Sequence, residues 1–286
     1  MLPYSLDLSR LSDAYAQGVL TPEQVVRDIH AAMPQHADNP VWINLVPEAD
    51  VLHQVSSLRV RREQGEVFPL YGVPFAVKDN IDVAGYPTTA ACPEFSHLPQ
   101  ASAFAVQCLL DAGAILIGKT NLDQFATGLV GTRSPYGACR NAFSPDYISG
   151  GSSSGSAVAV ALGWVSFALG TDTAGSGRVP AGFNNVVGLK PTRGLVSARG
   201  VVPACRSLDC VSVFALNCGD AAQVFNVMAR RDPLDDYARD DAPVVSRGIA
   251  GLRCGVPAEN DLQFHSDELA RSAFYKALDC LRAAGA

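Results

Sequence analysis

Apolar and polar positions in the first part of the chain follow a helical period. Two helices are predicted before about residue 49, the second within LTPEQVVRDIHAAM. Thr21 is a suitable N-cap there, Pro22 suits the first helical position, and Gln24 stands where a capping box needs it. A loop or short helix through Gln64 is expected next.

The segments that follow alternate between predicted strands and predicted helices. The predicted strands are Val73 to Val77, ending at Lys78, then Ile115 to Ile117, and Val165 to Leu169. Helices are predicted in SAFAVQCLLDAG, which Gly113 stops, from about Gly155 to Leu162, and after a Ser266 cap near the end. This order is typical of an α/β fold.

Charge is distributed unevenly along the chain. From Phe143 to Lys190 the only charged residues are Asp146, Asp172, Arg178 and Lys190, so we expect the Gly-rich turns of this interval to be buried. The opposite case is RRDPLDDYARDDAP, from Arg230, which we interpret as a solvated loop. Its carboxylates are spaced too irregularly for a metal loop, and no metal site is expected.

The overall composition limits the partners. The 286 residues are 48% hydrophobic and carry a net charge of -6, which favours neither nucleic acid nor an anionic membrane. We see no signal peptide and no apolar run long enough to span a bilayer, so a cytoplasmic protein is expected. Eight scattered cysteines without a CxxC pair are interpreted as small buried hydrophobes.

Lysine is rare in this chain. Only Lys78, Lys119, Lys190 and Lys276 occur among 22 basic residues. Unlike arginine, a buried lysine can lose its proton near neutral pH. Lys78 ends an apolar strand and can be a general base, although a structural salt bridge with Asp79 is an equal alternative.

A serine-rich run, SGGSSSGS from Ser149, leads directly into AVAVALGWVSFALG. A flexible linker would join polar surroundings, and a phosphate cradle would need GK[ST] or GxGxxG, neither of which follows. A nucleophile loop needs a base, and no histidine lies between His97 and His265. A neutral lysine is the other known base.

A second turn, GTDTAGSGRVPAG, follows the strand predicted to end at Leu169. A strand that leads into a tight turn and then a helix exposes backbone N–H groups around one hydroxyl, which is the geometry of an oxyanion hole. The alternative is that Ser176 only caps the helix.

These segments resemble the amidase signature family. The resemblance rests on GVPFAVKDNI, LLDAGAILIGKTNLDQFA, SPYG, GGSSSGSA, GTDTAGSGRVPAG and VVGLKPTRGLVS, which stand in the family's order and cover about half of the chain. It implies an α/β/α sandwich with a mixed central sheet flanked by helices. It also implies one domain over 1–286, with N-terminal helices at 1–65, a catalytic core at about 66–218, and a remainder, 219–286, that ends before the domain is complete.

The resemblance also assigns roles to residues. It makes Ser176 the acyl-forming nucleophile, Ser152 the bridging serine after a cis peptide, and Lys78 the general base. The oxyanion hole would consist of the N–H groups of Thr173, Ala174 and Gly175 with that of Ser176, and Ser153, Asp172 and Arg178 would support the site. Lys119 and Lys190 would be structural, and Ser154 and Ser156 helix-cap or packing residues. No cofactor or metal is implied.

The run around GSGRVPAGFNNVVGLKPTRG looks like the allophanate hydrolase branch of that family. The branch implies release of ammonia and carbon dioxide from allophanate in urea, biuret or s-triazine breakdown. An anionic substrate calls for an arginine clamp, for which Arg178 is the nearest candidate in sequence. Relatives are commonly homodimers. Open alternatives are another amidase, a glutamyl-tRNA amidotransferase A-type glutaminase, and a non-catalytic binding module.

Overall fold

The computed structural model describes residues 2–239 and 248–286. These residues form two compact units, 2–239 and 248–286. No described helix is long and apolar enough to cross a membrane. The end of the predicted charge-rich loop, 240–243, lies outside the described residues.

The first unit is built on one six-stranded mixed sheet. Its strands are β1 (Trp42–Leu45), β2 (Pro74–Lys78), β3 (Ile115–Thr120), β4 (Phe167–Thr171), β5 (Val187–Leu189) and β6 (Val211–Ala215). Their order is β1-β3-β2-β4-β6-β5, with β3, β2 and β4 parallel and the other pairs antiparallel. The carboxyl ends of the three parallel strands therefore meet at one edge of the sheet.

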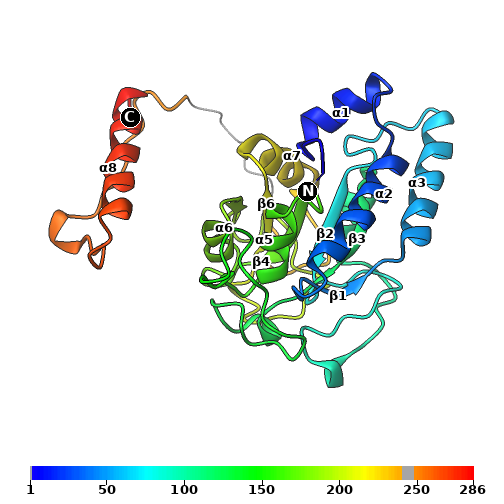
Figure 1. Cartoon of the computed structure of the whole chain (residues 1–286), viewed down its shortest axis with the longest axis horizontal. Helices are drawn as coiled ribbons and strands as arrows, with labels where there is room; N and C mark the ends of the chain where they lie inside the picture. Colours follow the sequence, from blue (N-terminus) through cyan, green and yellow to red (C-terminus); the bar gives the residue numbers. More distant parts are fainter. Residues whose placement is uncertain (1, 240–247) are drawn as a thin grey trace. The chain divides into compact units, whose positions relative to one another are not determined.

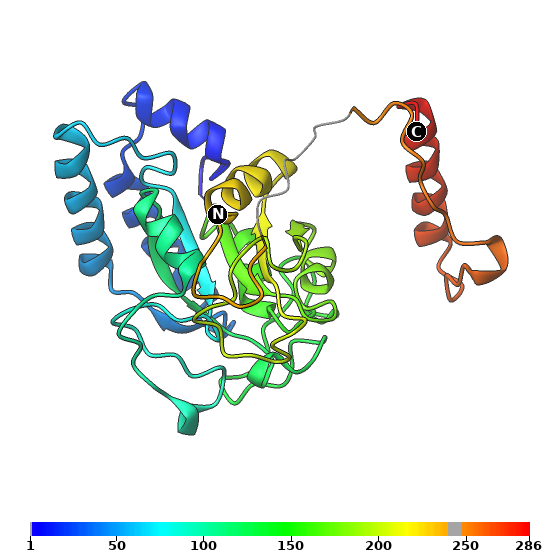
Figure 2. The same ribbon diagram turned by 180° about the vertical axis from the view of Figure 1, so that it is seen from behind.

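Helices flank this sheet (Figures 1 and 2). They are α1 (Leu8–Ala16), α2 (Pro22–Ala32), α3 (Glu48–Glu63), α4 (Phe104–Asp111), α5 (Ser154–Ala161), α6 (Arg178–Phe183) and α7 (Cys218–Met228). Short 3-10 turns occur at Met33–His36, Pro93–Phe95 and Gln124–Ala126. The predicted α/β class, with a mixed sheet flanked by helices, is confirmed.

The core lies between the sheet and these helices. Helix α5 packs on β2, β3 and β4, and α7 packs on β6 and β5. In the middle of the sheet, Phe75 and Phe167 are register partners whose ring centroids are 5.3 Å apart. Both rings are fully buried, so the two central parallel strands, β2 and β4, are fixed against each other by a stacked aromatic pair.

Some of the predicted helix and strand boundaries are confirmed, and others differ from the structure by a few residues. Thr21 Oγ1 accepts from the Gln24 amide at 3.2 Å, as a helix cap requires. The capping box is only half made, because the Gln24 side chain donates to Asp28 instead. Strand β3 runs on to Thr120, and β4 starts two residues later than predicted, at Phe167.

Three other expectations were wrong in part. The segment before Gln64 is a full helix, α3, of 16 residues. Asp232, expected in solvent, is 1% exposed, because it accepts from Arg199 and Ser197. Of the eight cysteines, only Cys108, Cys139 and Cys210 are buried.

The second unit contains a 3-10 turn at Glu259–Asp261 and the helix α8 (Glu268–Ala283). The N-cap of α8 is Asp267, whose carboxylate accepts from Ala270 N at 2.9 Å, so the predicted Ser266 cap is one residue too early. Phe264 packs against Phe274 with the ring centroids 5.7 Å apart. These aromatic side chains hold the turn region against α8.

Candidate active site

The predicted catalytic residues lie at the carboxyl edge of the parallel strands. Lys78 is the last residue of β2, and Thr171 is the last residue of its neighbour β4. Ser152 lies in the loop before α5, and Ser176 lies in the turn between β4 and α6. Chain segments that are about a hundred residues apart thus meet at one edge of the sheet.

Lys78 is completely buried. Its Nζ lies 2.8 Å from Ser152 Oγ and 2.8 Å from Thr171 Oγ1. Burial disfavours the charged ammonium and lowers the pKa of Lys78 to about 7, although nearby carboxylates oppose this shift. A substantial fraction of Lys78 is therefore neutral at physiological pH and able to accept a proton.

The alternative role of Lys78, a salt bridge with Asp79, was wrong. Asp79 Oδ1 instead lies 3.1 Å from Lys119 Nζ, and both side chains are fully buried. Asp79 also accepts from the amide and hydroxyl of Thr89. Asp79 is therefore paired with Lys119 and Thr89 and not with Lys78.

The serine loop is packed inside the protein. The peptide bond between Gly151 and Ser152 is cis. Every residue from Ser149 to Ser156 is buried, which excludes the linker interpretation. A Cβ on Gly151 would lie 2.1 Å from Asp123 Oδ2, and one on Gly155 would lie 2.5 Å from the carbonyl oxygen of Val41. Only glycine fits such close approaches.

The neighbouring serines connect this loop to β4. Ser153 Oγ donates to the carbonyl of Thr171 at 3.1 Å, and Ser156 Oγ donates to the carbonyl of Leu169 at 2.9 Å. Ser153 N donates to the carbonyl of Ser176 at 3.3 Å. The loop that carries Ser152 is therefore fixed to both the strand and the turn that carry the other site residues.

Ser176 is 5% exposed. Its Oγ donates to the carbonyl of Gly128 at 3.3 Å, and among the residues that the structure describes no hydrogen bond joins it to Ser152. The alternative role of Ser176, a helix cap, was wrong. The N-cap of α6 is Gly177, which has no side chain with which to make a cap hydrogen bond.

Asp172 organises the turn around Ser176. Its carboxylate accepts from the amides of Gly175 at 2.7 Å, Gly177 at 3.1 Å and Arg178 at 3.2 Å. Arg178 Nε and Nη2 donate to the same carboxylate at 2.9 and 3.1 Å. These hydrogen bonds hold the pKa of Asp172 below its usual value although burial acts against them. Since the charge of the Arg178 guanidinium is paired with Asp172 through Nε and Nη2, the geometry does not favour a substrate clamp at Arg178.

Backbone N–H groups in this turn differ in availability. The amide of Gly175 is used by Asp172. Within 2–239 and 248–286, the amides of Thr173, Ala174 and Ser176 make no hydrogen bond. Thr173 Oγ1 donates to Asp209 in a short hydrogen bond, which fixes the start of the turn. Three N–H groups next to one hydroxyl can receive a developing oxyanion.

Four residues near the site were missed by the sequence analysis: Thr171, Gly128, Asp123 and Asp209. Asp123 N donates to the carbonyl of Ser152 at 3.0 Å. The carboxylate of Asp123 accepts from Gly131 N at 3.0 Å and Arg133 N at 2.8 Å. A usable signal was present for Thr171, because it is the last residue of a strand that leads directly into a functional turn.

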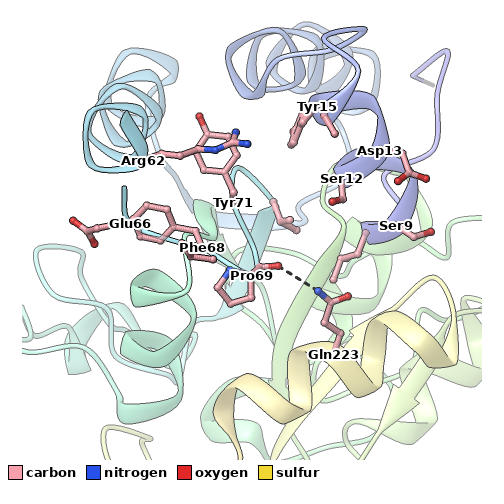
Figure 3. Close-up of a pocket in the computed structure, with 14 residues that line it drawn as sticks. Ser9, Ser12, Asp13, Tyr15, Arg62, Glu66, Phe68, Pro69, Tyr71 and Gln223 are labelled. Atoms are coloured by element: carbon pink, nitrogen blue, oxygen red, sulfur yellow. Dashed lines mark hydrogen bonds between the residues drawn. The ribbon is translucent and has the colours of Figure 1, made fainter. Parts of the chain in front are cut away.

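One cavity lies away from the serine site (Figure 3). It has a volume of about 520 Å³, and its lining includes Tyr15, Arg62, Tyr71 and Gln223. Its lining also includes Val73, directly before β2, whereas Lys78 ends that strand, so this cavity and the serine site lie at opposite ends of β2. Gln223 Nε2, at one side of this cavity, donates to the carbonyl of Pro69 at 3.3 Å.

Within the described chain, no group of three or more His, Cys, Asp or Glu residues could hold a metal ion.

Comparison with known proteins gives one family. The family model Amidase matches residues 29–286. A urea amidolyase from Saccharomyces cerevisiae is 62% identical over 216 residues, which are 75% of this chain and 12% of that protein. The solved allophanate hydrolase of Kluyveromyces lactis is 44% identical, with a TM-score of 0.80, over 99% of this chain and 46% of that one. The A-type component of the glutamyl-tRNA(Gln) amidotransferase from Acidobacterium capsulatum is 44% identical over 231 residues, 79% of this chain and 48% of that protein. The chain thus spans less than half the length of these relatives.

Proposed function

Because the chain belongs to the amidase family, we propose that it hydrolyses a linear amide through Ser176, Ser152 and Lys78. The observation that carries the proposal is the fully buried amine of Lys78, 2.8 Å from Ser152 Oγ, with a pKa lowered to about 7. Such a group is a base poised near the operating pH, which is where general base catalysis is most efficient. A purely structural lysine would instead pair with a carboxylate.

The proposed acylation step moves two protons. Lys78 accepts the proton of Ser152, and Ser152 accepts the proton of Ser176 as Ser176 Oγ attacks the amide carbon. This requires Ser176 Oγ to rotate away from the carbonyl of Gly128. The same relay then runs in reverse, delivers a proton to the departing amine and leaves an acyl-enzyme. Water deacylates Ser176 by the same route.

The developing oxyanion needs donors next to Ser176. The N–H groups of Thr173, Ala174 and Ser176 make no hydrogen bond within the described residues and are available to the oxyanion. Each preorganised donor of this kind contributes about 3 kcal/mol to transition-state stabilisation. Gly175, the other predicted donor, is engaged by Asp172, so the proposal uses its amide to hold the turn.

Allophanate is the proposed substrate. Support comes from the similarity to a urea amidolyase and to an allophanate hydrolase over most of this chain. Hydrolysis would release ammonia from the terminal amide, and the remaining N-carboxycarbamate decomposes to two molecules of carbon dioxide and a second ammonia. The alternative substrate, glutamine, is favoured by the 44% identity to the amidotransferase component.

Three wider expectations remain predictions. A single amidase domain over 1–286 and a homodimer have no direct test in the fold. A cytoplasmic location is supported by the eight cysteines, which are all free thiols. Sedimentation of the purified chain would test the dimer.

The experiment is ammonia release from allophanate, glutamine and simple amides by the wild type and by Ser176→Ala. We expect turnover of allophanate above the other amides and at least about a thousand-fold loss in the variant, because the nucleophile is removed. Far-ultraviolet circular dichroism checks that the variant is folded. Ammonia release that survives in folded Ser176→Ala would refute the proposed nucleophile, and a folded wild type without turnover would favour the non-catalytic module.

A further inference from the structure

The carboxylates around the proposed site create a problem for an anionic substrate. Asp123, Asp172 and Asp209 all raise the pKa of Lys78, so their negative charge is felt at the centre of the site. Arg178, the nearest cation in sequence to Ser176, donates both Nε and Nη2 to Asp172. An anion that approaches Ser176 therefore needs another cation.

A second cavity, of about 520 Å³, is lined by residues on both sides of Gly128, whose carbonyl accepts from Ser176 Oγ. It is formed by the 3-10 turn at Gln124–Ala126 and the segment that follows it. Its lining residues are Gln124, Phe125, Thr127, Arg133, Ser134 and Pro135. Arg133 is the one charged residue among them, and it is exposed. Within the described residues, Arg133 makes no salt bridge with a carboxylate, so its positive charge is not neutralised by a direct partner.

Arg133 is held in place at three points. Its amide donates to Asp123 Oδ1 at 2.8 Å, and its carbonyl accepts from Gln124 N at 2.7 Å. Its Nη1 donates to the carbonyl of Thr127 at 3.3 Å. A guanidinium carries five N–H donors, so the remaining ones can bind a carboxylate without a change of the backbone.

The same contacts link this cavity to the nucleophile. Thr127, which accepts from Arg133, directly precedes Gly128, whose carbonyl accepts from Ser176 Oγ. Asp123, which holds the Arg133 amide, donates its own amide to the carbonyl of Ser152. The guanidinium is therefore mounted on the loop that contacts both proposed catalytic serines.

We infer that this cavity is an anion-binding vestibule, in which Arg133 captures the carboxylate of the substrate before the amide reaches Ser176. The inference rests on the proposed function and narrows the substrate class to short amides with a carboxylate. Arg133 acts when the substrate carboxylate binds, and it takes no part in proton transfer. It should therefore control kcat/KM for anionic substrates more than kcat, and its effect should weaken as salt is added.

The test compares allophanate with biuret, which has a neutral carboxamide in place of the carboxylate. In Arg133→Gln, the ratio of kcat/KM for allophanate to kcat/KM for biuret should fall at least about fivefold at low salt, and the fall should shrink in high salt. Arg133→Lys should restore most of the ratio because it keeps the charge. Arg59→Gln, which removes an equal charge from α3, is the matched control and should keep the wild-type ratio.

Binding gives a readout that does not need turnover. In the Ser176→Ala background, Arg133→Gln should raise the dissociation constant of malonamate, a stable carboxylate analogue, by a similar factor in calorimetry. An unchanged ratio with rapid allophanate turnover would overturn the vestibule and leave the proposed function intact. A wild type that hydrolyses biuret and not allophanate would overturn the proposed substrate, and loss of malonamate binding in Arg133→Gln would still support the vestibule. Malonamate binding that does not depend on Arg133 would overturn the vestibule.

Discussion

Replacing Lys78 by methionine should remove activity and stabilise the fold at neutral pH. Methionine has a similar length and no charge, so it fills the buried space without a desolvation penalty. On folding, Lys78 must either lose its proton or be buried as an ion, and both cost free energy. Burial accordingly lowers the pKa of Lys78 from 10.5 to about 7. The unfolded chain binds this proton at neutral pH, and the folded chain partly releases it.

The magnitude follows from proton linkage. Between pH 7 and 10.5 the unfolded state binds more protons at Lys78, so the free energy of unfolding of the wild type rises with pH in this window. The cost of burying Lys78 is fully present below pH 7. It amounts to about 4 kcal/mol at pH 7 and about 1.4 kcal/mol at pH 9.5, a difference of about 3 kcal/mol.

The assay is urea denaturation of the wild type and Lys78→Met at these two pH values. Methionine also loses the hydrogen bonds to Ser152 and Thr171, but this loss does not depend on pH. The stability difference between the two proteins should therefore shift by about 3 kcal/mol in favour of the wild type at the higher pH. A stability difference that is the same at both pH values would show that Lys78 keeps an ordinary pKa in the folded protein.

Two further predictions concern the same site. The kcat/KM for allophanate should rise with pH to a plateau, with its midpoint near pH 7, because Lys78 must be neutral to act as a base; a profile that is flat from pH 6 to 8 would contradict this role. Asp172→Asn should lower the free energy of unfolding by about 2 kcal/mol at pH 7, measured in urea, because it weakens the hydrogen bonds to Gly175, Gly177 and Arg178. The lowered pKa of Asp172 means that its stabilisation is present above pH 3.8 and is lost on further acidification, so the two proteins should converge in acid.

The sequence pattern located the end of β2 correctly, whereas β3 and β4 end at Thr120 and Thr171, later than predicted. An apolar run that stops at a rare lysine is a local signal, and it placed Lys78 at the end of β2. The absence of charge around the serine loop likewise predicted burial, which the structure confirms. Both arguments use only residues that are neighbours in the chain.

Contacts between distant segments were harder to predict. Asp79 and Lys119 form an ion pair because β2 and β3 are adjacent and parallel. The sequence around either residue gives no indication of its partner, and the charged neighbour of Asp79, Lys78, is not that partner. Asp123 was missed for the same reason. It interacts with Ser152, Gly131 and Arg133 through three separate hydrogen bonds, none of which leaves a periodic pattern. Helix α3 was underestimated because its buried positions are few, namely Val51, Val55 and Leu58.

The tight packing at Gly151 and Gly155 has a consequence for how such enzymes can diversify. Any side chain at these positions would collide with Asp123 or with the backbone of Val41 and Asn121. These two positions of the serine loop therefore accept only glycine, and substitutions there cannot adapt the site to a new substrate. Changes in preference must arise in surrounding loops, such as the segment that carries Arg133, where exposed side chains can be exchanged while the buried lysine and serines stay in place.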